Sequence, residues 1–134
     1  MRADNAAKGG YPFARRYRLT KTDEFSSVFG FRRAIRGQLL MLHYLPREDA
    51  AGDPRLGLVV GKKLLKAAVR RNLVKRLVRE QFRLLRPGLP PCDLIVRLVT
   101  KPGQLDRKAI AAEAVALFGK LAQRMAKPGG ADRK

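Results

Sequence analysis

Residues 62–86, KKLLKAAVRRNLVKRLVREQFRLLR, are the most informative segment of the chain for its fold. It contains ten Lys or Arg residues and a single acid, Glu80. A helix over residues 66–85, turning by about 100° per residue, separates two faces. The apolar face consists of Val69, Leu73, Val74, Leu77, Val78, Leu84 and Leu85. The opposite face consists of Arg71, Asn72, Lys75, Arg76, Arg79, Arg83 and Arg86. The pattern predicts an amphipathic helix whose apolar face covers a sheet.

The polar face of this helix is a cationic ridge ~20 Å long. A charged helix face is more often solvated surface, and acids then alternate with bases along it. Here Glu80 alone can pair, with Arg76 or Arg83, so the other cations repel one another. We therefore expect the ridge to bind a polyanion. Arg70 projects into the apolar arc instead, and the pattern leaves its role open.

Weaker patterns predict the remaining elements. Apolar residues at helical spacing indicate a short helix over residues 21–29, with Thr20 as its N-cap and Gly30 as its end. Strands are expected at residues 38–45, 55–61 and 93–100, and a last helix at 104–125 with an apolar face of Ile110, Ala114, Leu117, Phe118 and Leu121. The first two strands, joined by a loop over residues 46–54, are expected to pair antiparallel.

The fold class that follows is α+β. We expect one domain over residues 18–125, an α/β sandwich with a small, mostly antiparallel sheet and the long basic helix. Residues 1–17 and 126–134 are expected to be flexible tails, the first of them basic.

Composition narrows the function. The chain has 134 residues, with 30 Lys and Arg against 11 acids, and a net charge of +19 at pH 7. This excess favours nucleic acid as the partner. The single cysteine, Cys92, excludes a disulfide framework. It lies in a proline-rich segment that predicts a turn, where we expect it to be inert. The single histidine, His43, excludes a metal site built on a pair of histidines. Residues 1–18 lack the apolar segment of a secretory signal, and no run spans a membrane, so we expect a cytoplasmic protein with no membrane contact.

The basic helix resembles the signature of the bacterial ribonuclease P protein subunit. That family carries A-x-x-R-N-x-x-K-R-x-x-R-E-x-F-R behind a Lys pair, which matches residues 68–83 behind Lys62 and Lys63. Further agreement lies at Arg18-Leu19, Glu24-Phe25, Val28-Phe29, residues 55–58, and Leu89-Pro90 followed by Asp93. One position departs, because the family usually has a base where this chain has Leu73.

The resemblance implies a ribonucleoprotein in which an RNA subunit removes the 5′ leader of precursor tRNA. The implied partners are that catalytic RNA and precursor tRNA, with no obligate protein partner. Mg²⁺ would serve the RNA subunit, none would be held tightly by the protein alone, and the protein would supply no catalytic residue. The implied fold contains a left-handed βαβ crossover, although ~98% of such crossovers are right-handed. Residues expected to bind the catalytic RNA are Lys62, Lys63, Arg71, Asn72, Lys75, Arg76, Arg79 and Arg83.

The resemblance also implies a cleft for the single-stranded leader, to which we assign Phe25, Phe29, His43 and Tyr44. Aromatic faces beside cations stack unpaired bases without sequence preference. The alternative for both phenylalanines is core packing. Periodicity does not decide which side of the strand lines the cleft, because His43 and Tyr44 point to opposite faces.

Two other functions fit parts of the sequence. A structural ribosomal protein would share the size, the charge and a basic helix. A stand-alone protein nuclease would need a set of metal-binding carboxylates, and the sequence shows no such spacing.

Overall fold

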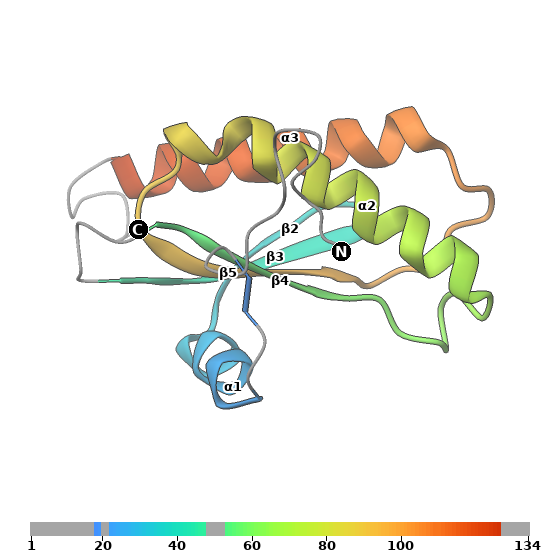
Figure 1. The fold of residues 1–134 in the computed structure, drawn as a ribbon, viewed down its shortest axis with the longest axis horizontal. Helices are drawn as coiled ribbons and strands as arrows, with labels where there is room; N and C mark the ends of the chain where they lie inside the picture. Colours follow the sequence, from blue (N-terminus) through green and yellow to red (C-terminus); the bar gives the residue numbers. More distant parts are fainter. Residues whose placement is uncertain (1–17, 20–21, 48–52, 127–134) are drawn as a thin grey trace, which may run out of the picture.

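The structure is a computed structural model, and it describes residues 18–19, 22–47 and 53–126. A four-stranded sheet has helices on both faces (Figure 1). The elements in chain order are α1 (Thr22–Phe31), β2 (Arg33–Arg36), β3 (Leu40–Pro46), β4 (Arg55–Val59), α2 (Ala68–Leu85), the 3-10 turn η2 (Arg86–Gly88), β5 (Cys92–Leu98) and α3 (Arg107–Ala126). The predicted α+β class is confirmed. The tail at 1–17, all of the tail at 126–134 except Ala126, the cap Thr20 and the middle of the 46–54 loop lie outside the described residues.

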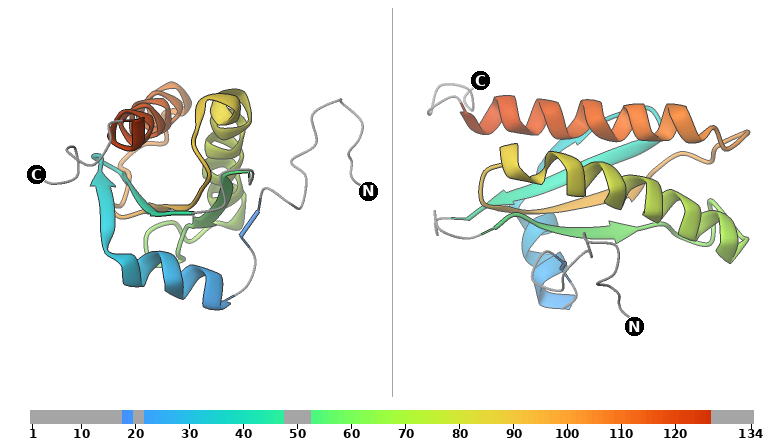
Figure 2. Two further views of the ribbon diagram at one scale, coloured as in Figure 1. Left: turned by 90° about the vertical axis from the view of Figure 1, so that its left-hand side faces the viewer. Right: turned by 45° about the horizontal axis from the view of Figure 1, so that its top comes forward.

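The sheet has the order β2-β3-β5-β4. β2 pairs antiparallel with β3, and β3 pairs antiparallel with β5, whereas β4 runs parallel to β5. A parallel pair needs a crossover connection, and α2 supplies it between β4 and β5. α2 and α3 cover one face of the sheet and α1 covers the other (Figure 2). The predicted βαβ unit is therefore present, and its hand stays a prediction.

The predicted antiparallel pairing of residues 38–45 with 55–61 is wrong, because β5 lies between these two strands. β5 is buried at six of its seven positions, since it is covered on both faces, and a strand of that kind belongs in the centre of a sheet. β4 takes the edge, where Arg18 forms a parallel bridge with Leu56. The connecting loop is too long to impose a hairpin.

Two local features also differ from expectation. Gly30 lies inside α1, which ends one residue later. The chain reverses at Arg32, whose φ of 64° is left-handed and whose amide donates to the Phe29 carbonyl. β2 was not predicted, because its four residues, RAIR, bury a single side chain, Ile35, and give no alternating pattern.

The core between the sheet and α2 and α3 corrects the predicted orientation of the long helix. Val74, Val78 and Phe82 are buried, whereas Val69 is 79% exposed and Leu84 is 56% exposed. On a helical wheel the buried stripe is turned by about 90° from the centre of the predicted apolar face, toward the cations. The reason is α3, whose predicted apolar face is confirmed and whose Phe118 ring lies 5.9 Å from that of Phe82.

A single carboxylate ties α3 to the turn between β2 and β3. The Oε2 atom of Glu113 accepts hydrogen bonds from the amides of Leu39 at 2.8 Å and Leu40 at 2.7 Å. Gly37 allows this approach, because a Cβ there would stand 2.3 Å from the same oxygen.

Replacing Glu113 should therefore destabilise the fold. We expect Glu113→Ala to lower the free energy of unfolding by about 1–3 kcal/mol, since two part-buried amides lose their acceptor. Urea denaturation measures the effect. Glu113→Gln, which keeps a carbonyl oxygen at this position, should lose less. Equal unfolding midpoints for the wild type and Glu113→Ala would contradict the assignment.

Candidate nucleic-acid interface

The rotation of α2 decides where its cations lie. Arg71, Lys75 and Arg79 are half-buried along the flank of the helix that borders the buried stripe, whereas Asn72 and Arg76 are exposed. The predicted ridge is thus a band that runs from the outer surface of α2 down its flank. Arg83, further along the helix, forms an ion pair with Glu80, as the sequence allowed.

The turn before α2 carries the predicted lysine pair. Lys62 and Lys63 are exposed on a turn closed by hydrogen bonds from the amides of Leu64 and Leu65 to the Gly61 carbonyl. Arg71 reaches back to this segment, where its guanidinium donates to the carbonyls of Leu65 at 3.0 Å and Lys66 at 2.7 Å. Arg71 therefore has a structural role besides its charge.

A groove of about 200 Å³ brings the cations of α2 together with an aromatic ring of α1. Its lining comprises Arg18, Leu19, Phe25, Leu56, Gly57, Leu58, Lys75 and Arg79. Gly57 makes the close approach of α1 possible, because a Cβ there would lie 2.6 Å from the Phe25 ring. The sequence predicts the ridge and the cleft as separate surfaces, and the tertiary structure joins them in this groove.

The groove concentrates positive charge. Burial lowers the pKa of Arg79 from its ordinary value, and the neighbouring charge of Arg18 lowers it further. A guanidinium nevertheless stays protonated at neutral pH. Two cations held close together in a concave site attract a negatively charged group.

Beyond the groove, the α1 face of the sheet carries Phe29 and His43. Their rings meet edge to face, with 4.8 Å between centroids. The Nε2 atom of His43 accepts a hydrogen bond from Nε of Arg97 at 3.2 Å. Burial lowers the pKa of His43 below 6.5, and the charge of Arg97 lowers it further, so the imidazole is neutral at pH 7. Arg97 was missed, because one basic residue in an apolar strand gives no pattern.

Tyr44 corrects the predicted cleft. It is 3% exposed in the core between the sheet and the other two helices, and its hydroxyl accepts a hydrogen bond from Arg124 of α3 at 3.5 Å. Successive strand residues point to opposite faces, so Tyr44 cannot share a surface with His43. Assigning Tyr44 to the same surface as the other three residues was wrong.

The alternative of core packing for the phenylalanines holds in part. Phe25 and Phe29 are half-buried and pack against a small cluster of Leu19, Val28 and Ile95. Both rings therefore stabilise α1 on the sheet, and each keeps part of its surface exposed.

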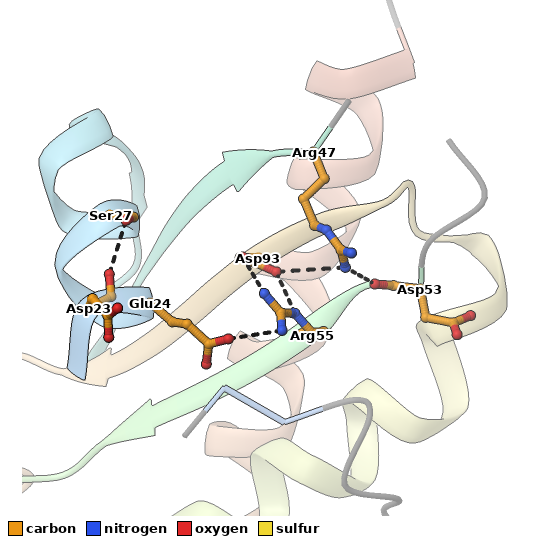
Figure 3. Close-up of polar contacts among 7 residues, drawn as sticks. All are labelled: Asp23, Glu24, Ser27, Arg47, Asp53, Arg55 and Asp93. Atoms are coloured by element: carbon orange, nitrogen blue, oxygen red, sulfur yellow. Dashed lines mark hydrogen bonds and ion pairs between the residues drawn. The ribbon is translucent and has the colours of Figure 1, made fainter. Parts of the chain in front are cut away.

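An ion-pair network fixes one end of α1 (Figure 3). Arg55 of β4 donates to both carboxylate oxygens of Asp93, each at 2.9 Å, and to Glu24 of α1 at 3.0 Å. The hydrogen bond with Asp93 is the largest cause that raises the pKa of Arg55. Arg47 lies 3.9 Å from the same aspartate. The network was not predicted, although an aspartate at the start of a buried strand signals a cationic partner.

The described residues offer no metal-binding cluster, and their one cysteine is buried. Among residues 18–19, 22–47 and 53–126 there is no cluster of three or more His, Cys, Asp or Glu side chains suited to a metal ion. Cys92 begins β5 rather than lying in a turn, and burial, followed by the charge of Asp93, raises its pKa to about 12. The thiol is thus buried and protonated at neutral pH. No helix in the described part of the chain is long and apolar enough to cross a bilayer.

Comparisons with known proteins identify the family. The family model described as ribonuclease P matches residues 13–122. The chain belongs to the ribonuclease P protein family. The ribonuclease P protein component of Azoarcus sp. strain BH72 is 55% identical over 107 residues, covering 80% of this chain and 88% of that protein. The ribonuclease P protein component of Chromobacterium violaceum is 45% identical over 113 residues, which cover 84% of this chain and 92% of that protein.

Solved ribonuclease P proteins share the fold. The Staphylococcus aureus protein superposes with a TM-score of 0.70 at 24% identity, covering 78% of this chain and 94% of that one. The Thermotoga maritima protein superposes with a TM-score of 0.66 at 24% sequence identity, and the match covers 77% of this chain and 96% of that one. Family membership decides against a structural ribosomal protein. The chain is the protein subunit of an RNA-based endoribonuclease that processes tRNA, and its partner is the RNA subunit.

The lowered pKa of His43 predicts a specific pH dependence of stability. The folded protein binds this proton more weakly than the unfolded chain. The stability contributed by neutral His43 is therefore complete above about pH 6.5 and is lost as the pH falls through the folded pKa. Urea unfolding at pH 7.5 and 5.5 should show a larger loss for the wild type than for His43→Gln. Parallel losses would show that His43 does not contribute.

Proposed function

We propose that the basic band of α2 and the Lys62–Lys63 turn bind the RNA subunit, and that the groove beside Phe25 receives the unpaired 5′ leader of precursor tRNA. The observation that carries this proposal is the shared lining of the groove. One concave site offers an aromatic ring from α1 and three cations: Arg18, Lys75 and Arg79. Stacking faces and cations together are what a single strand requires.

The proposal divides the work between protein and RNA. Glu24 and Asp93 of the described chain are held by Arg55. We therefore assign the hydrolytic step and its Mg²⁺ ions to the RNA subunit. The role of the protein is to neutralise phosphates and to hold the leader, which needs no second protein.

Reconstitution tests the proposed function as a whole. At low Mg²⁺ concentration, this chain should restore cleavage of precursor tRNA by the RNA subunit. The chain alone should leave the same substrate intact. Cleavage by protein that is free of RNA, or no stimulation of the RNA subunit, would contradict the proposal.

The α2 band can be tested with single substitutions. We expect Lys75→Ala and Arg76→Ala each to weaken binding of the RNA subunit by about 1 kcal/mol and to reduce the salt dependence by about one unit of slope. Filter binding at several salt concentrations gives both values. Lys120→Ala, an exposed cation on α3, is the matched control. Variants indistinguishable from this control would mean that the band is merely solvated.

The groove can be tested by removing one aromatic face. Phe25→Leu keeps most of the apolar burial but removes a stacking surface, and stacking contributes roughly 1–3 kcal/mol per base. The reconstituted holoenzyme should then bind precursor tRNA at least about tenfold more weakly and bind mature tRNA as before. Phe29→Leu should act in the same direction but less strongly, because this ring lies one turn further along the same face of α1 and packs on the same apolar cluster, but does not line the groove.

Phe31→Leu is the control for this experiment. Phe31 lies on the same helix, is 42% exposed and does not line the groove. It should leave both tRNA affinities unchanged. Equal weakening of precursor and mature tRNA by Phe25→Leu, or a large fall in its melting temperature, would show that Phe25 acts only in the core.

A further inference from the structure

A second concave surface lies between the beginnings of α2 and α3. It is a hollow of about 750 Å³ lined by Arg70, Leu73 and residues 103–108. The first turns of both helices lie at the same end of the molecule (Figure 1). We call this surface the α2–α3 hollow. It shares no lining residue with the groove beside Phe25.

Arg70, whose role the sequence pattern left open, lines this hollow. Arg70 is exposed, although the wheel placed it in the apolar arc, because the buried stripe is turned away from it. It lies about 140° around α2 from Lys75, which lines the groove. The cations of α2 therefore face two separate concave surfaces, one on each flank of the helix.

The lining of the hollow is cationic. Arg70, Arg107 and Lys108 are all exposed, and none has an ion pair or a side-chain hydrogen bond to a described residue. The single acid in the lining, Asp106, accepts a hydrogen bond from the Ala109 amide at 3.1 Å and so caps α3. Three cations face one carboxylate that is already engaged, so the hollow attracts an anion.

The chemistry of the lining indicates what that anion is. No aromatic side chain lines the hollow, so it offers no face on which an unpaired base could stack. Its cations suit phosphates, which position a nucleic acid without reading its bases. Double-helical RNA, whose bases are paired and whose backbone is exposed, fits these groups better than a single strand.

We propose that the α2–α3 hollow binds the sugar–phosphate backbone of a double-helical segment of the RNA subunit. A duplex that contacts both the Lys62–Lys63 turn and the hollow would lie across the first turns of α2. The inference rests on the proposed function and adds to it a contact surface on the far flank of α2, reaching the first turn of α3.

The test removes charge from the hollow without changing the helices. Arg70→Gln and Lys108→Gln, made singly and together, keep side chains that are good helix formers. Each single variant should bind the RNA subunit about threefold to tenfold more weakly, with a salt slope lower by about one. The double variant should lose about two units of slope. Circular dichroism and a thermal melt check that each variant is folded.

Lys120→Gln is the matched control. It removes the same charge from an exposed position on α3, about 18 Å further along the helix than Lys108. Hollow variants that bind the RNA subunit as the control does would overturn the inference. A lost preference for precursor over mature tRNA, with unchanged binding of the RNA subunit, would also overturn it, because the hollow would then hold substrate. If the wild type failed to bind the RNA subunit, the proposed function would fail as well.

Discussion

The contact between Phe82 of α2 and Phe118 of α3 fixes how the long basic helix is rotated about its axis. With Val74 and Val78, Phe82 forms a buried stripe at four-residue spacing that must face both the sheet and α3. Burial of two large aromatic rings stabilises this arrangement more than burial of Val69, which stays exposed. The positions of the cations follow from this rotation: Arg71, Lys75 and Arg79 lie along one flank and Arg70 on the other, whereas Arg76 lies on the outer surface.

On the opposite face of the sheet, α1 is held by a smaller apolar cluster together with ion pairs. The ion pair of Glu24 with Arg55 joins the first turn of α1 to β4, while Arg55 also pairs with Asp93 of β5. Gly57 lets the ring of Phe25 approach the backbone of β4. The groove therefore exists because α1 packs closely at this point. The same ion pairs engage two acids, which fits a protein that assists a reaction carried out by RNA.

Part of the candidate site could be predicted from the chain alone. The spacing of Lys75, Arg76 and Arg79 along one helix, and of Phe25 and Phe29 along another, is local information. Tyr44 was misassigned because its side of the strand depends on which face each helix covers. Arg97 and Asp93 were missed because their partners, His43 and Arg55, lie far away in the sequence.

The net charge follows from composition alone. The amphipathic character of α2, the apolar face of α3 and the family signature could be read from the chain, since each depends on residues within a few turns of one another. The strand order, the rotation of α2 and the meeting of Phe25 with Lys75 in one groove depend on long-range packing. The physical reason is that β5, buried on both faces, takes the centre of the sheet. It separates two strands that are consecutive in the chain, and no local pattern encodes that competition for burial.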